Sequence, residues 1–415
     1  MKKKCDNAKK SGNTYFIGDC IEPDCINDFA RYLQMAEKGN AEAQKNLGDM
    51  YADGDGVKQD YATAFEWYFK AAERGNAEAQ TNLGYMYCTG DGVKQNYIKA
   101  FEWYTKAAEQ GYPNAQDNLG IMYDNGDGVE QDYIKAFELY TKAAKQGYAS
   151  AQNHLGLMYK DGNGVEQDYI KAFEWYTKAA KQGNANAQNN LGLMYEDGNG
   201  VEQDYTKAVE WYTKATKQGN VVPQYNLGRM YYFGKGVVQD YAKAFGWYSK
   251  AAKQGFTNAQ EKLGDMYFMG DWVERDYAKA FGWYSKAAKQ GYANAQHNLG
   301  VMYFNGYGVK QDYAKAVEWF TKAAEQGDKD AQSILGKMYC KGIGVEQDYT
   351  KAFEWITKAV EQGYADAQYV FGFMYYYGYG VKQDYAKAKE WFTKAAEQGD
   401  TDAKNALSVM QDHGY

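Results

Sequence analysis

Residues 149–183 read ASAQNHLGLMYKDGNGVEQDYIKAFEWYTKAAKQG, and this pattern returns along the chain every 36 residues. Ten copies run from Asn40 to Gly399 without insertion or deletion, and a Leu-Gly pair such as Leu47-Gly48 marks nearly all of them. A period of this length indicates a stacked-repeat protein, in which each repeat contacts mainly its neighbours. Ten copies of one design also allow the positions that stay constant to be compared with those that vary.

The first copy, residues 40–75, predicts two helices joined by a turn. Apolar residues recur at three- and four-residue steps over 41–53, as they do on one side of a helix. Two glycines then turn the chain, and Asp60 stands where an N-cap is expected before a second helix over 61–72. Gly75 closes that helix. Each copy is therefore expected to be one helix-turn-helix unit, called a repeat below and numbered 1 to 10.

A glycine lies inside the first helix of every repeat, at Gly48 and its nine counterparts. Glycine in a helix interior costs about 1 kcal/mol relative to alanine, so ten such residues need a structural reason. We expect a neighbouring helix to approach closely there, with a Trp or Tyr side chain over the missing Cβ.

The two ends of the chain depart from the pattern. We expect a flexible N-terminal segment over 1–14, a partial capping repeat over 15–39, the ten repeats over 40–399, and a C-terminal capping helix with a tail over 400–415. Terminal repeats of a solenoid need a more polar outer face, and residues 400–415 fit this need because Ser and Gln replace the usual Gly and Tyr.

The pattern A-x-A-Q-x-x-L-G-x-M-Y-x-x-G-x-G-V-x-x-D-Y-x-K-A-x-E-W-Y-x-K-A-A-x-Q-G resembles the Sel-one-like repeat (SLR), a relative of the tetratricopeptide repeat. The resemblance covers about residues 15–410. It implies an all-α fold, a right-handed α/α solenoid of ten 36-residue repeats whose first helices line the concave side. Members of that family are mostly adaptors that hold other proteins together, in eukaryotic membrane-associated complexes and in bacterial signalling and host interaction.

Variation between repeats is concentrated on the first helix. The positions of Glu42, Lys45, Asp49 and Ala52 change from repeat to repeat and lie three, four and three residues apart, so they share one helical face. We expect this face to point outward, and by the resemblance into the groove. Function is therefore expected on the first helix and on the loop after it.

The chemistry of that face changes along the chain, from acidic and polar in repeats 1–5 to aromatic with scattered basic groups in repeats 6–10. Aromatic residues and Arg dominate the energetically important parts of binding interfaces. The candidate partner-binding residues, called the groove set below, are Tyr225, Arg229, Tyr232, Phe233, Phe268, Phe304, Tyr307, Tyr369, Phe373, Tyr376 and Tyr377.

Three interpretations of the groove set remain open. It could bind a protein or peptide partner, mediate self-association of the chain, or pack between adjacent repeats. Trp272, which replaces a loop glycine found in the other repeats, is either tolerated drift or a contact residue.

Composition narrows the partners and the compartment. A net charge of −7 and a pI near 5.3 argue against nucleic acid as a partner. No segment has the length or apolar character of a membrane span or a signal peptide, so we expect a cytoplasmic protein, or one exported to a host by a route other than Sec. The five cysteines are expected to be reduced, although a Cys20–Cys25 disulfide is conceivable.

No catalytic, metal-binding or cofactor-binding motif is present. The three histidines lie far apart in the repeat pattern, and the Asp-Gly-Asp-Gly loops lack the further ligands of a calcium or phosphate loop. We therefore expect a non-catalytic scaffold or adaptor with no cofactor. Two alternatives follow from the resemblance: a β-lactamase-like hydrolase or penicillin-binding protein, by analogy to relatives that are secreted and carry a cysteine pair in each repeat, and a secreted effector that engages host proteins.

Overall fold

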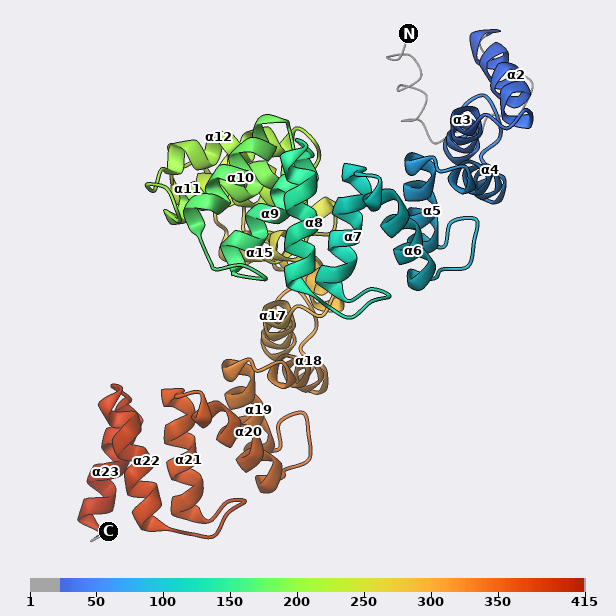
Figure 1. Cartoon of the computed structure of the whole chain (residues 1–415). Coiled ribbons are helices and arrows are strands. Elements are labelled where there is room, and N and C mark those ends of the chain that lie inside the picture. The colour runs from blue at the N-terminus through green and yellow to red at the C-terminus, as the bar shows by residue number, and fades with distance from the viewer. Residues whose placement is uncertain (1–22, 414–415) are drawn as a thin grey trace. The chain divides into compact units, whose positions relative to one another are not determined.

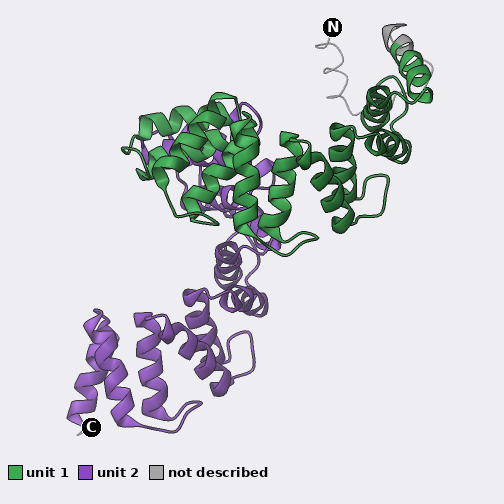
Figure 2. Cartoon of the chain, viewed as in Figure 1, with its two compact units in different colours: residues 1–215 green, residues 216–415 purple. Residues whose placement is uncertain are grey.

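The computed structural model describes residues 23–413, and these residues form helices and the turns between them, with no strand. The helices are labelled along the chain in Figure 1. The chain divides into two compact units, residues 1–215 and residues 216–415, which are coloured separately in Figure 2. The prediction of an all-α solenoid of helix-turn-helix repeats is confirmed.

Unit 1 holds repeats 1 to 5 and one helix before them. Helices that are consecutive in the sequence pack side by side, as α3 does with α4 and α4 with α5. The helices are α2 (Pro23–Glu37), α3 (Ala41–Asp53), α4 (Tyr61–Glu73), α5 (Ala77–Thr89), α6 (Tyr97–Glu109), α7 (Pro113–Asn125), α8 (Tyr133–Lys145), α9 (Ala149–Asp161), α10 (Tyr169–Lys181), α11 (Ala185–Asp197) and α12 (Tyr205–Thr216).

Unit 2 holds repeats 6 to 10 and one helix after them, with the same order of packing. Its helices are α13 (Val221–Phe233), α14 (Tyr241–Lys253), α15 (Thr257–Met269), α16 (Tyr277–Lys289), α17 (Ala293–Asn305), α18 (Tyr313–Glu325), α19 (Lys329–Lys341), α20 (Tyr349–Glu361), α21 (Ala365–Tyr377), α22 (Tyr385–Glu397) and α23 (Thr401–Asp412).

The helix ends follow the signals in the sequence. In repeat 1, Gly54 ends α3 with a left-handed backbone (φ 71°), a conformation that glycine adopts without steric cost. Asp60 then caps α4, because its Oδ1 accepts hydrogen bonds from the backbone N–H groups of Ala62 (3.0 Å) and Thr63 (3.2 Å). The same cap precedes most second helices, so the predicted helix boundaries are confirmed to within a residue.

The glycines inside the first helices lie against aromatic rings, as predicted, although the ring is Tyr rather than Trp in most repeats. A Cβ built on Gly84 would lie 2.6 Å from Cε1 of Tyr104, which belongs to the second helix of the same repeat. Ordinary contacts between carbon atoms begin near about 3.5 Å, so only glycine fits at this helix crossing. In repeats 8 to 10 the tyrosine is replaced by Phe320, Ile356 and Phe392, respectively.

Buried glutamines link each repeat to the one before it. In repeat 2, Gln110 Nε2 donates to Gln80 Oε1 (2.7 Å), and Gln80 Nε2 donates to the carbonyl oxygen of Ala72 in repeat 1 (3.1 Å). Equivalent pairs recur in both units, for example Gln290 with Gln260. The constant Gln of the sequence pattern thus adds a side-chain hydrogen bond to a carbonyl group in the last turn of the preceding helix, which also accepts the backbone N–H of Gly75.

The predictions for the chain ends fall partly outside the described residues. Residues 1–14 and the first part of 15–39 lie there, while α2 covers residues 23–37 and α23 follows the last repeat. The flexible segment and the two capping repeats stay predictions. A Cys20–Cys25 pairing also lies outside the described side chains.

Candidate functional site

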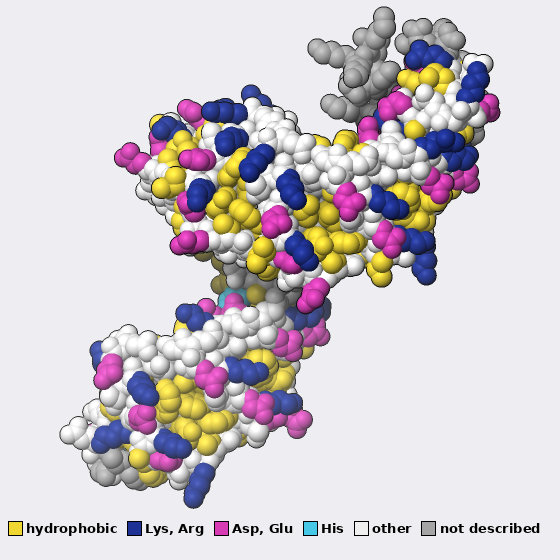
Figure 3. Space-filling model, in the orientation of Figure 1, with side chains coloured by type: hydrophobic (Ala, Val, Ile, Leu, Met, Phe, Trp, Pro, Cys, Tyr) yellow, Lys and Arg dark blue, Asp and Glu magenta, His cyan; other side chains and the backbone are white. Residues whose placement is uncertain are grey.

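The groove set divides by exposure. Four of its members are exposed: Phe233 (61% of the residue's surface), Tyr377 (50%), Tyr307 (36%) and Phe373 (36%). The other seven, including Arg229, are partly buried. Exposed aromatic residues on this scale are characteristic of interaction sites. Figure 3 shows hydrophobic side chains in patches bordered by charged ones on the face in view.

Four partly buried members pack inside their own repeat. Each lies near the end of a first helix and contacts the tyrosine that begins the second helix. This contact covers part of the surface of each ring, which is then not accessible to a binding partner. The pairs and the distances between their ring centroids are Tyr232–Tyr241 (5.1 Å), Phe268–Tyr277 (5.2 Å), Phe304–Tyr313 (5.1 Å) and Tyr376–Tyr385 (5.2 Å).

Tyr232 also connects two repeats. Its hydroxyl donates a 2.8 Å hydrogen bond to Oδ2 of Asp271, in the loop of repeat 7. Burial and this carboxylate raise the pKa of Tyr232 to about 12, because both disfavour the phenolate. Next along unit 2, Phe268 contacts Tyr307 from the following loop, with ring centroids 5.7 Å apart.

The end of α21 carries the densest aromatic cluster. The ring centroids of Phe373 and Tyr377 are 4.5 Å apart, and those of Tyr376 and Tyr377 are 4.8 Å apart. Tyr379, from the loop after the helix, contacts Tyr377 at 5.5 Å. Three members of the groove set thus form one continuous aromatic surface in repeat 10.

Tyr225 and Tyr369 lie elsewhere, at the position equivalent to Lys45. Tyr225 packs between Tyr248 (5.7 Å) and Phe256 (5.3 Å), and Tyr369 packs against the core ring Phe392 (5.7 Å). The contact of Tyr225 with Phe256 joins repeats 6 and 7 and supports the packing interpretation for Tyr225, whereas the contact of Tyr369 with Phe392 lies within repeat 10.

The expectation that the whole varied face points outward is wrong at the Lys45 position. The residues there are buried in seven repeats, because this position lies beneath the first helix of the next repeat. They are Lys45, Thr81, Asp117, Asn153, Asn189, Glu261 and Ser333.

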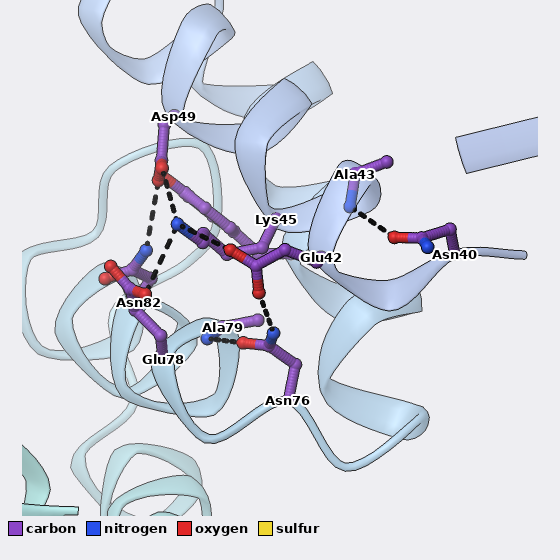
Figure 4. Close-up of polar contacts among 10 residues, drawn as sticks. Asn40, Glu42, Ala43, Lys45, Asp49, Asn76, Glu78, Ala79 and Asn82 are labelled. Carbon is purple, nitrogen blue, oxygen red and sulfur yellow. Dashed lines mark hydrogen bonds and ion pairs between the residues drawn. The ribbon is translucent and has the colours of Figure 1, made fainter. Parts of the chain in front are cut away.

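Polar contacts between repeats explain why this position varies in chemistry without being exposed. Lys45 Nζ lies 3.3 Å from Asp49 Oδ2, 3.5 Å from Glu42 Oε1, and 3.3 Å from Oε2 of Glu78 on α5 (Figure 4). Burial lowers the pKa of Lys45, but the surrounding carboxylates outweigh it, and the net direction is upward. A different pair serves repeats 3 and 4, where His154 Nδ1 lies 2.8 Å from Oδ1 of Asp117.

Several acidic residues of repeats 1–5 are therefore not part of an open surface. Asp117 and Glu196 are only 3% and 5% exposed, and Glu196 accepts a 2.7 Å hydrogen bond from the hydroxyl of Tyr212. Asp49 accepts the same kind of bond from Tyr68 (2.8 Å). The acidic half of the predicted groove is thus smaller than the sequence indicates.

A pocket of about 330 Å³ opens between α17 and α19 in unit 2. It is named the α17–α19 pocket below, and its volume falls at the lower end of the range of ligand sites. Phe304 is the one member of the groove set that lines this pocket. Ile334 was not predicted, because its position lies outside the varied positions from which the groove set was chosen. The lining residues are Val301, Phe304, Asn305, Phe320, Ile334, Lys337, Met338, Lys341 and Ile343.

Trp272 is the one non-glycine residue with a positive φ (66°) in the described part of the chain. Its glycine counterparts have the same backbone, as Gly236 does (φ 68°), and a non-glycine residue pays about 1–2 kcal/mol there. The indole is 58% exposed and leans on the ring of Phe245, with centroids 6.1 Å apart. Both interpretations of Trp272 stay open.

Reactive chemistry is sparse across the described residues. They include no group of three or more His, Cys, Asp or Glu residues arranged to hold a metal ion. Cys88 and Cys340 are free, and burial raises the pKa of both thiols, which lowers their reactivity. Among the described helices, none is both long enough and apolar enough to cross a bilayer.

Comparison with known proteins identifies the repeats. The Sel1 repeat model matches ten segments, which are residues 41–76, 77–112, 113–148, 149–184, 185–220, 224–256, 257–292, 293–328, 329–364 and 365–400. A search of curated proteins found no match.

Two solved structures are similar over most of the chain. One is c5321 of uropathogenic Escherichia coli, described as a protective antigen with an SLR fold. It is 37% identical over 93% of this chain and 91% of its own, with a TM-score of 0.58. The other is a Sel1 repeat protein from Oxalobacter formigenes, 35% identical over 79% of this chain and 97% of its own, also with a TM-score of 0.58. Ten matched repeats show that this chain belongs to the Sel1 repeat family.

Proposed function

We propose that this chain is a non-catalytic adaptor that binds a protein or peptide partner through the groove set on the first helices of unit 2. Sel1 repeat proteins are generally protein-interaction modules, which agrees with this role. The observation that carries the proposal is the exposure of Phe233, Tyr307, Phe373 and Tyr377 at varied positions of an otherwise regular scaffold. Exposed rings on a stable solenoid reduce solubility unless a partner covers them.

The packing contacts indicate which aromatic rings are expected to contribute most to the affinity for a partner. Tyr225 and Tyr369 pack against the core rings of Tyr248 and Phe392, so their loss would weaken the fold rather than binding alone. Phe233, Phe373 and Tyr377 present at least a third of their surface and can be shortened without opening the core. A cytoplasmic location, or export to a host, stays a prediction that the partner's identity would decide.

The test compares wild type with the triple variant F233A/F373A/Y377A. V238A is the matched control, because Val238 is 89% exposed on a loop outside the groove set. Each protein is used as bait for cross-linking and mass spectrometry in extracts of the native cell and of a candidate host. We expect partners captured by wild type and V238A to be lost with the triple variant, at an unchanged melting temperature.

Two results would contradict the proposal. Undiminished capture by the triple variant would place binding elsewhere on the chain. A concentration-dependent dimer in sedimentation velocity, abolished by the triple substitution and accompanied by no captured partner, would instead favour self-association through the same rings.

A further inference from the structure

We propose that the α17–α19 pocket binds a peptide segment in which a large apolar side chain is followed or preceded closely by a carboxylate. This inference rests on the proposed function and adds to it a second site, beside Phe304 of the groove set, and one class of ligand. It depends on the residues that make the pocket apolar and on the charge at its mouth.

The apolar floor contains Val301 of α17 and Phe320 of α18. In repeat 7, Tyr284 donates a 2.8 Å hydrogen bond to Oδ1 of Asp265, and in repeat 1 Tyr68 donates one of the same length to Asp49. The equivalent positions in repeat 8 hold Phe320 and Val301. Repeats 2 to 6 also lack the acid but keep the tyrosine, so repeat 8 is the first repeat without either group, and both Val301 and Phe320 line the pocket.

On the opposite wall of the pocket, apolar residues stand where other repeats carry polar ones. Ile334 stands where six of the ten repeats carry Asn. Ile343 stands where the first three repeats carry Asp. Phe304, Ile334 and Ile343 are only partly buried by the chain itself, so their remaining surface is available to a ligand. Covering apolar surface contributes about 25 cal/mol per Å².

The mouth of the pocket is basic. Two lysines line it, and the lining residues include no carboxylate. Lys337 is held by Asp366 of the next repeat, with both carboxylate oxygens 2.6 Å from its Nζ, and Ser333 fixes the same carboxylate at 2.8 Å. Lys341 is exposed, and no ion pair to it is found among the described residues. A ligand carboxylate would therefore pair with Lys341 while the adjacent side chain fills the pocket.

The experiment selects peptides from a random dodecapeptide library on the purified full chain. Enriched sequences are expected to place Leu, Ile, Met, Phe or Trp within two residues of Asp or Glu. The affinity of a synthetic enriched peptide is then measured by fluorescence anisotropy for wild type, for F233A/F373A/Y377A and for three further variants. V301D/F320Y restores the tyrosine–aspartate pair of repeats 1 and 7, K341E reverses the charge at the mouth, and K310E is the charge-matched control on an exposed loop residue.

The expected result is a loss of affinity of about tenfold or more for V301D/F320Y, which corresponds to about 1.4 kcal/mol, and of at least about threefold for K341E. K310E should bind as wild type does, and all variants should melt as wild type does. Peptides that lose affinity only in F233A/F373A/Y377A would overturn the pocket proposal and leave the proposed function standing. Failure to enrich any sequence would overturn the pocket as a peptide site, while the cross-linking experiment decides the proposed function separately.

Discussion

Two glycines in repeat 7 make a paired stability experiment, because alanine is expected to act in opposite directions at the two sites. Gly264 lies inside α15 against the ring of Tyr284, and a Cβ built there would lie 2.5 Å from Cε1 and 2.6 Å from Cδ1. Gly282 lies on the exposed side of α16, two residues before that tyrosine, and a Cβ built there would meet no atom within 4 Å. Both are helical, so the gain in helix propensity is the same, about 1 kcal/mol.

The cost at Gly264 follows from how firmly the ring is held. Relief of the overlap requires the Tyr284 ring to move by about 1 Å, and overpacking of this kind costs about 1–3 kcal/mol. The ring can retreat only by lengthening the hydrogen bond from its hydroxyl to Asp265, which adds about 1 kcal/mol. After the propensity gain is subtracted, G264A should destabilise unit 2 by about 1–3 kcal/mol, whereas G282A should stabilise it by about 1 kcal/mol.

Thermal and urea unfolding followed by far-UV circular dichroism measure both effects. For a unit of roughly 200 residues, about 1 kcal/mol shifts the melting temperature by about 2–4 °C. We therefore expect G282A to melt above wild type and G264A below it. In a Y284F background the ring is released from Asp265, so the cost of G264A should fall. Equal or greater stability of G264A would refute the close-packing explanation, and destabilisation by G282A would refute the assignment of that site to open solvent.

Two further predictions concern helix capping and a buried acid. N184A should destabilise the protein by about 1 kcal/mol in urea unfolding, because Asn184 Oδ1 accepts a hydrogen bond from the backbone N–H of Ala187 at 2.9 Å. The control N294A, at an exposed helical position, should change the free energy of unfolding by less than about 0.5 kcal/mol. Burial, and then the charge of Asp265, raise the pKa of Glu261 above its ordinary value of 4.5, so its ionised form costs stability once the pH exceeds that value. E261Q should therefore be more stable than wild type at pH 7, and the difference should shrink as the pH falls below 4.5, where both side chains are neutral; a difference that grows on acidification would contradict this.

The fold was largely predictable because its signals are local and repeated. The predicted helix over 41–53 matches α3 (Ala41–Asp53), and Asp60 caps α4 as expected. These boundaries depend on caps and turn glycines that act within a few residues of the chain. The contact between Gly48 and a tyrosine ring was also predictable, because ten unfavourable helix glycines require one common cause.

The site was less predictable because helical periodicity places residues on a face without saying what covers that face. Lys45 and Asp49 share a side of α3, yet the stacking of α5 buries Lys45 and leaves Asp49 partly exposed. The α17–α19 pocket depends on Val301, Phe320 and Ile334, which are brought together only by tertiary packing. The sequence nevertheless held a signal for the pocket. Repeats 1 to 7 have Tyr at the position of Phe320, and repeat 8 is the first with another residue there.

In three repeats, a carboxylate at a varied position accepts a hydrogen bond from a core tyrosine. Tyr68 with Asp49, Tyr212 with Glu196, and Tyr284 with Asp265 each join a core tyrosine to a carboxylate on a first helix. Where the carboxylate is satisfied in this way, it belongs to the scaffold, and its charge is not offered to a partner.

Repeat 8 has neither the core tyrosine nor the carboxylate at these two positions. In repeat 4, Leu157 holds the position of the acid, and the buried hydroxyl of Tyr176 has no hydrogen-bond partner, which costs about 1–3 kcal/mol. Loss of the tyrosine hydroxyl alone would leave a partly buried acid. Phe320 and Val301 together avoid both costs, so the scaffold tolerates an apolar surface at this point. V301D/F320Y restores a pair that the scaffold holds in repeats 1 and 7, so a loss of peptide affinity at an unchanged melting temperature would separate binding from folding.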